Sequence, residues 1–372
     1  MTSHTFDGTA VRPPRRWRIV LPLAVVVVLL AAAWVGLWYY AAARAQSELA
    51  ALRAREAATG REVSCANESV GGFPFRLELR CADPGLNLRR ARLSLQAKDM
   101  LAAVQVYQPT LMIAEFGGPL TISDEARGAK YALDWSLAQA SVRGLPRPER
   151  VSLVLDKPAL GRLDAEQLGR ADHAELHVRP APRLANDPPA IDVSLALTKA
   201  LLIAVPRVGN APIDADIAGT LRGVGDLSPK PLPQLMREIA AANGRLDITR
   251  ARIQQGDILA TGSGTLRLTQ RGTLDGELAL TVAGIDQLVA LLGVDKAVGQ
   301  ASQRALDRIA PGLNLDRLLG PRGGAALAAA GAAMLGQPTE LEGRQAVTLP
   351  LRFADGVVFL GPLRAREIQP LF

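Results

Sequence analysis

The chain has 372 residues, of which 48% are hydrophobic and 4% are aromatic, and it carries a formal net charge of +7. Any hydrophobic core must therefore consist mainly of Leu, Val, Ile and Ala side chains. No cluster of Lys and Arg with interleaved aromatic residues occurs, which argues against nucleic-acid binding. Residues 1–18 hold four arginines and Asp7, so the rest of the chain has only a small positive excess.

Residues 19–43 (IVLPLAVVVVLLAAAWVGLWYYAAA) contain no charged side chain. As a helix rising about 1.5 Å per residue, this run would be roughly 37 Å long, enough to cross a hydrocarbon core of about 30 Å with some tilt. The segment therefore predicts one transmembrane helix through the lipid bilayer. Four aromatic residues gather near its C-terminal end, where amphipathic rings favour the membrane–water interface: Trp34, Trp38, Tyr39 and Tyr40.

Arginines flank this segment unequally. Only Arg44 follows it closely, whereas four arginines precede it: Arg12, Arg15, Arg16 and Arg18. This asymmetry predicts that residues 1–18 form a cytoplasmic tail. A cleaved signal peptide ending at Ala41 and Ala43 is the alternative, but the apolar run exceeds the roughly 7–15 residues typical of such peptides. We therefore expect an uncleaved anchor, continued by a helical stalk over residues 44–59 that Gly60 ends.

The chain has two cysteines, Cys65 and Cys81, both shortly after the membrane segment. In an oxidising compartment, a lone pair at this spacing predicts a disulfide. Closing a loop of about 15 residues stabilises a fold by on the order of 3 kcal/mol in the chain-entropy model. The alternative is a zinc site completed by His173 and His177, but the cysteines lack the close C-x-x-C spacing of such sites.

Residues 60–372 are predicted to form one β-rich domain, with a sub-boundary near residues 180–190 as an option. Short runs such as RLELR, VSLVLD and IDVSLAL alternate apolar and polar residues, and a period of two marks half-buried strands. Each run has one apolar face, which favours antiparallel meanders covered on one side only. The predicted fold class is therefore mainly β (α+β): an elongated, mostly antiparallel sheet with a few packed helices.

Local signals place the remaining elements. Helices are predicted over residues 165–175, 231–242, 285–319 and 325–335, and strands over Arg245–Ile253, Asp257–Ser263, Gly264–Thr269 and Gly276–Val282. Gly262 and Gly264 lack the following Lys and helix of a phosphate loop, and are predicted as bulge or turn positions. The pair Asp355-Gly356 between two apolar runs predicts a closing hairpin.

The chain contains no H-E-x-x-H, G-x-S-x-G, Walker or EF-hand motif. His173 and His177 have no neighbouring nucleophile in a recognisable motif, and we expect them to be solvated on a strand. Asp214 and Asp216 lie on one face of a strand, as paired carboxylates of a site would, but this spacing is common on the wet face of a strand. We expect no enzymatic activity, no catalytic residue, no metal and no cofactor.

Three segments resemble the bacterial envelope proteins of domain-of-unknown-function family 2125: SVGGFPFRLELRC (Ser69 to Cys81), YALDWSLAQASVRG (Tyr131 to Gly144) and LPLRFADGVVFLGPL (Leu349 to Leu363). The resemblance runs over most of residues 15–372, and the G-G-F-P-F hairpin is its most specific part. That family has no established activity, so the resemblance implies location and architecture but no reaction. The spacing of strands and glycines in residues 244–284 is also similar to that in the strand repeats of AsmA-like proteins. Those proteins are inner-membrane-anchored, β-rich and implicated in handling envelope lipids.

Together these patterns predict a single-pass protein of the bacterial inner membrane, with its N-terminus in the cytoplasm and its bulk in the periplasm. An apolar sheet face without catalytic groups suits the binding or shielding of a lipid acyl chain along a β-sheet groove. The other interpretation is that the helices predicted over residues 231–242 and 285–335 cover that face completely. The alternative function is a tethered scaffold that binds another envelope protein through an exposed strand edge.

Overall fold

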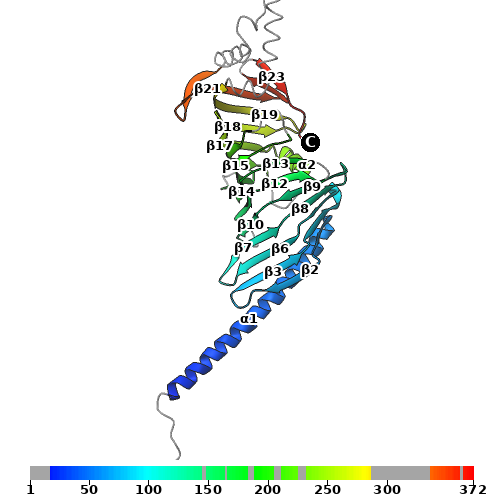
Figure 1. The fold of residues 1–372 in the computed structure, drawn as a ribbon, viewed down its shortest axis with the longest axis vertical. Coiled ribbons are helices and arrows are strands. Elements are labelled where there is room, and N and C mark those ends of the chain that lie inside the picture. The colour runs from blue at the N-terminus through cyan, green and yellow to red at the C-terminus, as the bar shows by residue number, and fades with distance from the viewer. Residues whose placement is uncertain are drawn as a thin grey trace, which may run out of the picture.

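The computed structural model describes residues 17–144, 148–163, 166–182, 188–204, 211–224, 232–285, 336–360 and 363–372. These residues form a long N-terminal helix and an elongated β-structure that extends beyond it (Figure 1). Every pairing between their strands is antiparallel. The predicted mainly β fold class with an N-terminal helix is confirmed.

The first element is a single helix, α1 (Trp17–Ala58), which is 42 residues long. It joins the predicted membrane segment to the predicted stalk without a break. Gly60 follows the helix with a φ of +84°, a conformation that glycine adopts without steric cost. The apolar first part of α1 projects away from the strands, whereas its second part lies along them (Figure 1).

The strands form two sheets. The smaller sheet contains, in spatial order, β1 (Arg61–Ser64), β4 (Gly85–Leu88), β5 (Leu93–Gln96), β8 (Leu120–Asp124), β9 (Ala129–Asp134), β12 (Ala159–Arg162) and β13 (Gln167–Arg170). The larger sheet contains, in spatial order, β2 (Asn67–Gly71), β3 (Arg76–Ala82), β6 (Asp99–Gln105), β7 (Gln108–Gly117), β10 (Leu137–Arg143), β11 (Arg150–Asp156), β14 (His173–Pro180), β15 (Ala190–Ala200), β16 (Ile213–Arg222), β17 (Arg245–Gln255), β18 (Ile258–Leu268), β19 (Leu274–Ala283), β21 (Arg344–Ala354), β22 (Val357–Leu360) and β23 (Leu363–Glu367), with β20 (Gln337–Leu341) paired to β21. A short 3-10 helix, η1 (Arg89–Ala91), links β4 to β5.

In the described part of the chain, the backbone crosses between the two sheets seven times, and each crossing takes two residues: 65–66, 83–84, 97–98, 118–119, 135–136, 157–158 and 171–172. Backbone hydrogen bonds join neighbouring crossings. The Asp83 N–H donates to the Lys98 carbonyl oxygen at 3.0 Å, and the Lys157 N–H donates to the Asp172 carbonyl oxygen at 2.9 Å. The ladder therefore continues through the crossings, so the two sheets are halves of one antiparallel sheet folded along a crease.

The second helix, α2 (Leu232–Ala241), confirms the helix predicted over residues 231–242. Asn243 has a φ of +51°, and the Gly244 N–H donates to the Ile239 carbonyl oxygen at 2.7 Å, so a left-handed cap ends the helix. The helix packs on the larger sheet through one cluster of apolar residues: Val224, Ile239, Ala240 and Leu268, surrounded by Ile191, Leu221, Leu235, Met236, Leu274 and Phe372. α2 therefore covers the ends of a few strands of the larger sheet.

The helix predicted over residues 165–175 is wrong. The structure instead has β13, a two-residue crossing and the first part of β14. The segment HAELHV alternates polar and apolar residues, and β14 pairs with β11 on one side and β15 on the other. Hydrogen bonding on both edges overrides the helix propensity of its Ala, Glu and Leu residues.

The strands predicted over Asp257–Ser263 and Gly264–Thr269 are one continuous strand, β18. Gly262 and Gly264 do not turn the chain. They lie opposite a bulge in the neighbouring strand β17, where the register shifts between Ile248 and Ala251. The strands predicted over Arg245–Ile253 and Gly276–Val282 correspond to β17 and β19.

The predicted closing hairpin is confirmed, because β21 and β22 pair on either side of Asp355 and Gly356. Both turn residues have positive φ angles, +51° and +80°, as a tight primed turn requires. Beyond Ile285, the helices predicted over residues 285–319 and 325–335 lie outside the described residues. Near the sub-boundary considered at residues 180–190, β14 and β15 pair along their length.

We expect Gly264→Ala to lower the free energy of unfolding by about 1–3 kcal/mol. Gly264 has a φ of +148°, and an added Cβ would clash with the backbone of Glu277 and Leu278 on β19. The measurement is denaturant unfolding of the full chain in mild detergent. The control is Gly262→Ala, whose Cβ would make an ordinary contact at 3.6 Å with the Ala279 carbonyl oxygen. Equal losses in the two variants would contradict the strain at Gly264.

Candidate functional site

One side of the larger sheet carries two parallel rows of apolar residues, which we call the apolar rows. Paired residues in an antiparallel sheet lie on the same face, so the strand register defines each row. The first row consists of Val70, Leu79, Ala102, Ala114, Ala140, Leu153, Leu176, Leu195, Ile217, Ala251, Gly262, Leu280 and Leu349. The second consists of Leu77, Val104, Met112, Val142, Val151, Val178, Val193, Gly219, Ile248, Gly264, Leu278 and Leu351.

Neither row contains a polar or charged side chain. The first row crosses thirteen strands, from β2 to β21, and strands in a sheet lie about 4.8 Å apart, so it is roughly 55–60 Å long. It begins at β2, the edge strand of the larger sheet, which contacts α1. The first row therefore runs from the edge beside α1 to β21, two strands before the far edge of the sheet at β23.

Most residues of these rows are only partly buried. The buried hydrophobic residues among those described are mostly alanines, and the large side chains buried most completely are Leu259 and Val282. Beside the rows, Ile253 is 41% exposed. An apolar hollow of about 100 Å³ lies over the bulge, lined among others by Ile248, Leu280 and Leu351. Among the described residues, the apolar side is thus a partly exposed surface with hollows.

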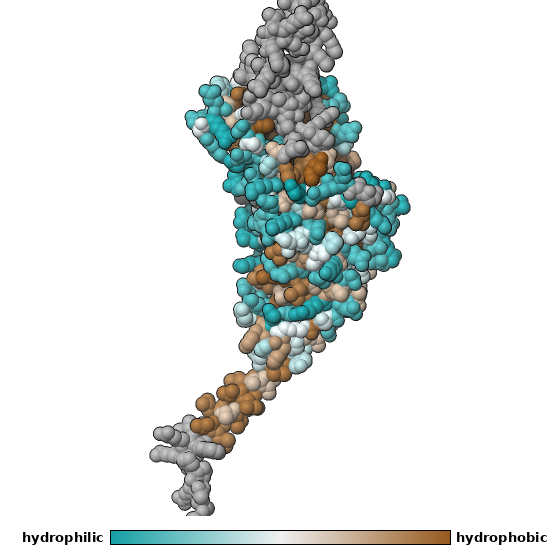
Figure 2. All heavy atoms as spheres, in the orientation of Figure 1, coloured by the Kyte–Doolittle hydropathy of each residue, from teal (hydrophilic) through white to brown (hydrophobic). Residues whose placement is uncertain are grey.

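The smaller sheet also has one apolar side. Leu86, Leu95, Ile122 and Tyr131 are successive partners across β4, β5, β8 and β9. Leu88, on the same side of β4, and Gln234 of α2 line one pocket of about 300 Å³. Because α2 also packs on the apolar side of the larger sheet, it lies between the two halves, and both apolar sides face the inside of the fold. Figure 2 shows hydrophobic residues along the middle of the face in view, with hydrophilic residues on both flanks.

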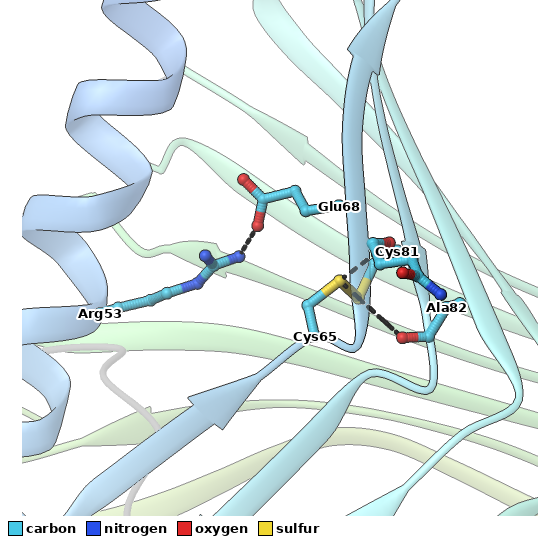
Figure 3. The surroundings of a disulfide bond; sticks show 6 residues. Arg53, Cys65, Glu68, Cys81 and Ala82 are labelled. Carbon is cyan, nitrogen blue, oxygen red and sulfur yellow. Dashed lines mark hydrogen bonds and ion pairs between the residues drawn. A yellow bond between two sulfur atoms is a disulfide. The ribbon is translucent and has the colours of Figure 1, made fainter.

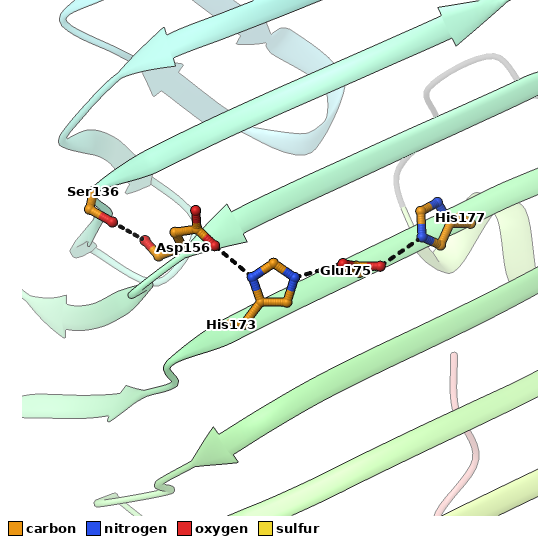
Figure 4. Close-up of polar contacts among 5 residues, drawn as sticks. All are labelled: Ser136, Asp156, His173, Glu175 and His177. Atoms are coloured by element: carbon orange, nitrogen blue, oxygen red, sulfur yellow. Dashed lines mark hydrogen bonds and ion pairs between the residues drawn. The ribbon is translucent and has the colours of Figure 1, made fainter.

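The opposite side of the larger sheet is polar, and the two histidines considered in the sequence lie there (Figure 4). His173 contacts Asp156 through Nδ1 at 2.6 Å and Glu175 through Nε2 at 2.7 Å. His177 contacts Glu175 at 3.0 Å and Ser152 at 2.8 Å. The hydrogen bonds that His173 makes to Glu175 and Asp156 raise the pKa of His173, and the hydrogen bonds that Glu175 accepts from the two histidines lower the pKa of Glu175.

The paired carboxylates considered in the sequence, Asp214 and Asp216, have separate partners. Asp214 accepts a hydrogen bond from the Lys199 backbone N–H at 2.8 Å, and Asp216 forms an ion pair with Arg250 at 2.8 Å. Each carboxylate therefore has a structural partner on the polar side of the sheet. Their arrangement indicates surface pairing across strands rather than a shared site.

Cys65 and Cys81 form a disulfide with a Cα–Cα distance of 5.6 Å (Figure 3). Cys65 follows β1 of the smaller sheet and Cys81 lies in β3 of the larger sheet, so the bond ties the two halves at their α1 end. An ion pair between Arg53 of α1 and Glu68 of β2 lies beside it. This overturns the zinc alternative, because the thiols are consumed. In the described part of the chain, no group of three or more His, Cys, Asp or Glu residues could hold a metal.

One buried charge was not recognised in the sequence. Glu78 of β3 is the buried charged residue among those described, with 4% of its surface exposed. Arg76 and Arg80 on the same strand contact its carboxylate at 2.5 Å and 2.9 Å, and its cross-strand partner is Gly71. The pattern R-L-E-L-R was a signal for this arrangement, since residues two apart share a face.

Residues 38–366 match the model of a family described as uncharacterised proteins conserved in bacteria, DUF2125. The chain belongs to this family. A comparison with curated proteins found no match, and the similarity to AsmA-like proteins is not among these findings. The matched region of this DUF2125 protein contains the aromatic end of the apolar segment, the disulfide and both apolar rows.

We expect Glu175→Gln to lower the pKa of His173 in this DUF2125 protein toward its ordinary value of 6.5. A protonated His173 donates to both Asp156 and Glu175, so its raised pKa stabilises the fold below pH 6.5, and the contribution is lost as the pH rises through the folded pKa. The measurement is an NMR titration of the full chain with labelled histidine. The control is Glu277→Gln, which removes a carboxylate from the same polar side of the larger sheet, on β19, and should leave the pKa of His173 unchanged. An unchanged His173 midpoint in Glu175→Gln would contradict the assignment.

Proposed function

We propose that this protein is anchored in the bacterial inner membrane by α1 and binds lipid acyl chains along the apolar side of its folded sheet. Its N-terminus lies in the cytoplasm and the sheets lie in the periplasm. Its role is to hold or shield lipid rather than to catalyse a reaction. The single observation that carries this proposal is the continuity of the two apolar rows across the larger sheet.

An acyl chain needs extended apolar contact and no hydrogen-bonding partner. The apolar rows offer such contact over roughly 55–60 Å at about 4.8 Å per strand. Their partial exposure supports the proposal as well, because a side chain that is already fully buried has no apolar area left to give to a ligand. The hollow over the bulge, which Gly262 lines without a side chain, adds room at one point of the surface.

The anchor rests on α1. Among the described residues, one helix is long and apolar enough to cross a membrane: the range Val20–Ala58, whose most apolar stretch is not buried by the rest of the chain. The arginines before the apolar segment support a cytoplasmic N-terminus. The disulfide supports an oxidising compartment for the sheets. The family match to bacterial proteins is compatible with a periplasm.

We expect Leu195→Glu to weaken acyl-chain binding at least about tenfold, because transferring an ionised carboxylate into hydrocarbon costs far more than the 1.4 kcal/mol that a tenfold change represents. Leu195 lies in the first apolar row on β15. The measurement is photocrosslinking of the full chain in vesicles with a photoactivatable phospholipid. Peptide mapping separates adducts on the strands from those on α1.

The matched control is Ser194→Glu, because this neighbouring side chain points to the polar side of the same strand. It should leave adducts on the strands unchanged. Adducts confined to α1 in the unaltered chain would contradict lipid binding by the sheet and would favour the tethered scaffold. Equal adduct yields on the strands in both variants would also contradict the proposed position of the acyl chain.

We expect the cysteines of the full chain to resist a maleimide reagent in intact cells quenched with acid, and to gain two adducts after reduction. The physical reason is that a disulfide persists in an oxidising compartment and is reduced in the cytoplasm. A chain lacking residues 1–43, which would remain in the cytoplasm, should gain both adducts without reductant. Labelling of the full chain without reductant would contradict the periplasmic location.

A further inference from the structure

The turn between β2 and β3, residues 72–75, packs against the apolar segment of α1; we call these residues the hairpin tip. Trp34 donates a hydrogen bond from Nε1 to the Pro74 carbonyl oxygen at 3.0 Å, and its ring lies 6.4 Å from that of Phe75. One turn later, Trp38 donates to the Arg76 carbonyl oxygen at 2.9 Å, and its ring lies 5.5 Å from that of Phe73. Trp38 is buried by these contacts.

These contacts fix the height of the hairpin tip along the helix. From Ile19, the first residue after Arg18, to Trp34 the helix rises only about 22 Å. A hydrocarbon core is about 30 Å thick, and any tilt of the helix shortens its reach further. A helix that spans the membrane from Ile19 therefore carries Trp34, and the hairpin tip bound to it, into the outer part of the bilayer.

The surface of the tip suits that position. Phe73 is 50% exposed and Phe75 is 63% exposed, although both lie next to tryptophans of α1. The turn between β6 and β7 lies beside the tip, because the Val106 N–H donates to the Phe75 carbonyl oxygen at 2.9 Å. This turn presents Tyr107, which is 73% exposed. Aromatic side chains exposed together in this way favour the membrane–water interface.

We propose that the hairpin tip and Tyr107 insert into the periplasmic leaflet, so that the α1 end of the apolar rows opens directly onto the lipids of that leaflet. Leu77 begins the second row on β3, shortly after the tip, and Leu79 of the first row lies two residues further along the same strand. A lipid can then move its acyl chain from the leaflet to the sheet without crossing water. This inference rests on the proposed membrane anchor and names bilayer lipid as the source of the ligand.

The test is depth-dependent quenching with the full chain in vesicles of equal parts phosphatidylcholine and phosphatidylglycerol. An environment-sensitive fluorophore is attached at Tyr107→Cys, and the acyl chains either carry bromine or do not. We expect brominated chains to quench this fluorophore at least about twofold, as an interfacial aromatic position requires. The control is Asp355→Cys in the distal turn between β21 and β22, where no quenching is expected. A second variant, Phe75→Ser, should reduce the quenching at position 107.

Equal quenching at positions 107 and 355, in a chain that resists extraction with carbonate, would overturn the insertion of the tip. The anchor would then stand, and crosslinking to the strands would still decide whether the sheet binds lipid. Extraction of the full chain by carbonate would instead contradict membrane anchoring by α1, and both proposals would then fail. Strong quenching at position 107 alone supports the inserted tip.

Discussion

The backbone hydrogen-bond ladder that continues through the crease is the constraint on which the rest of this structure depends. A strand left at a sheet edge exposes unpaired N–H and C=O groups. Here each crossing takes two residues and pairs with its neighbours, so the sheet folds in two while its backbone groups at the crease, such as those of Asp83 and Lys157, remain paired. The fold therefore has two connected halves with one continuous apolar side, and it does not need a compact centre.

The composition explains why this side is only partly buried among the described residues. With 4% aromatic residues, the chain lacks the large rings that would fill the space between two sheet halves. Alanine takes three successive places in the first row, at Ala102, Ala114 and Ala140. α2 fills only the region near Leu221 and Leu268. In the described part of the chain, what remains is a partly exposed apolar surface with hollows, and neither apolar row contains a charged residue.

The polar side has a different role. Its side chains pair across strands, as in His173 with Asp156 and Arg250 with Asp216. Such exposed pairs each stabilise a fold by only about 0–1 kcal/mol. They contribute mainly to register, since a slip by one residue would carry charged groups to the apolar side. The register in turn keeps the apolar rows continuous.

The sequence alone determined the elements whose signals are local. Four such elements are the charge-free run in α1, the helix predicted over residues 231–242, the turn at Asp355 and the pairing of the two cysteines. Each depends on residues close together in the chain or on composition. The apolar rows were foreseen only as one-faced strands, because their continuity depends on which strand pairs with which.

The tertiary structure decided everything that required partners distant in the chain. The segment at residues 165–175 has helix-forming residues, and only β11 and β15 on its two sides make it a strand. Gly264 carries a turn signal, yet the bulge on β17 makes it part of a continuous strand. The height of the hairpin tip depends on contacts from Trp34 and Trp38 to residues about forty positions later. Such contacts follow from the folded backbone ladder, and no local pattern encodes them.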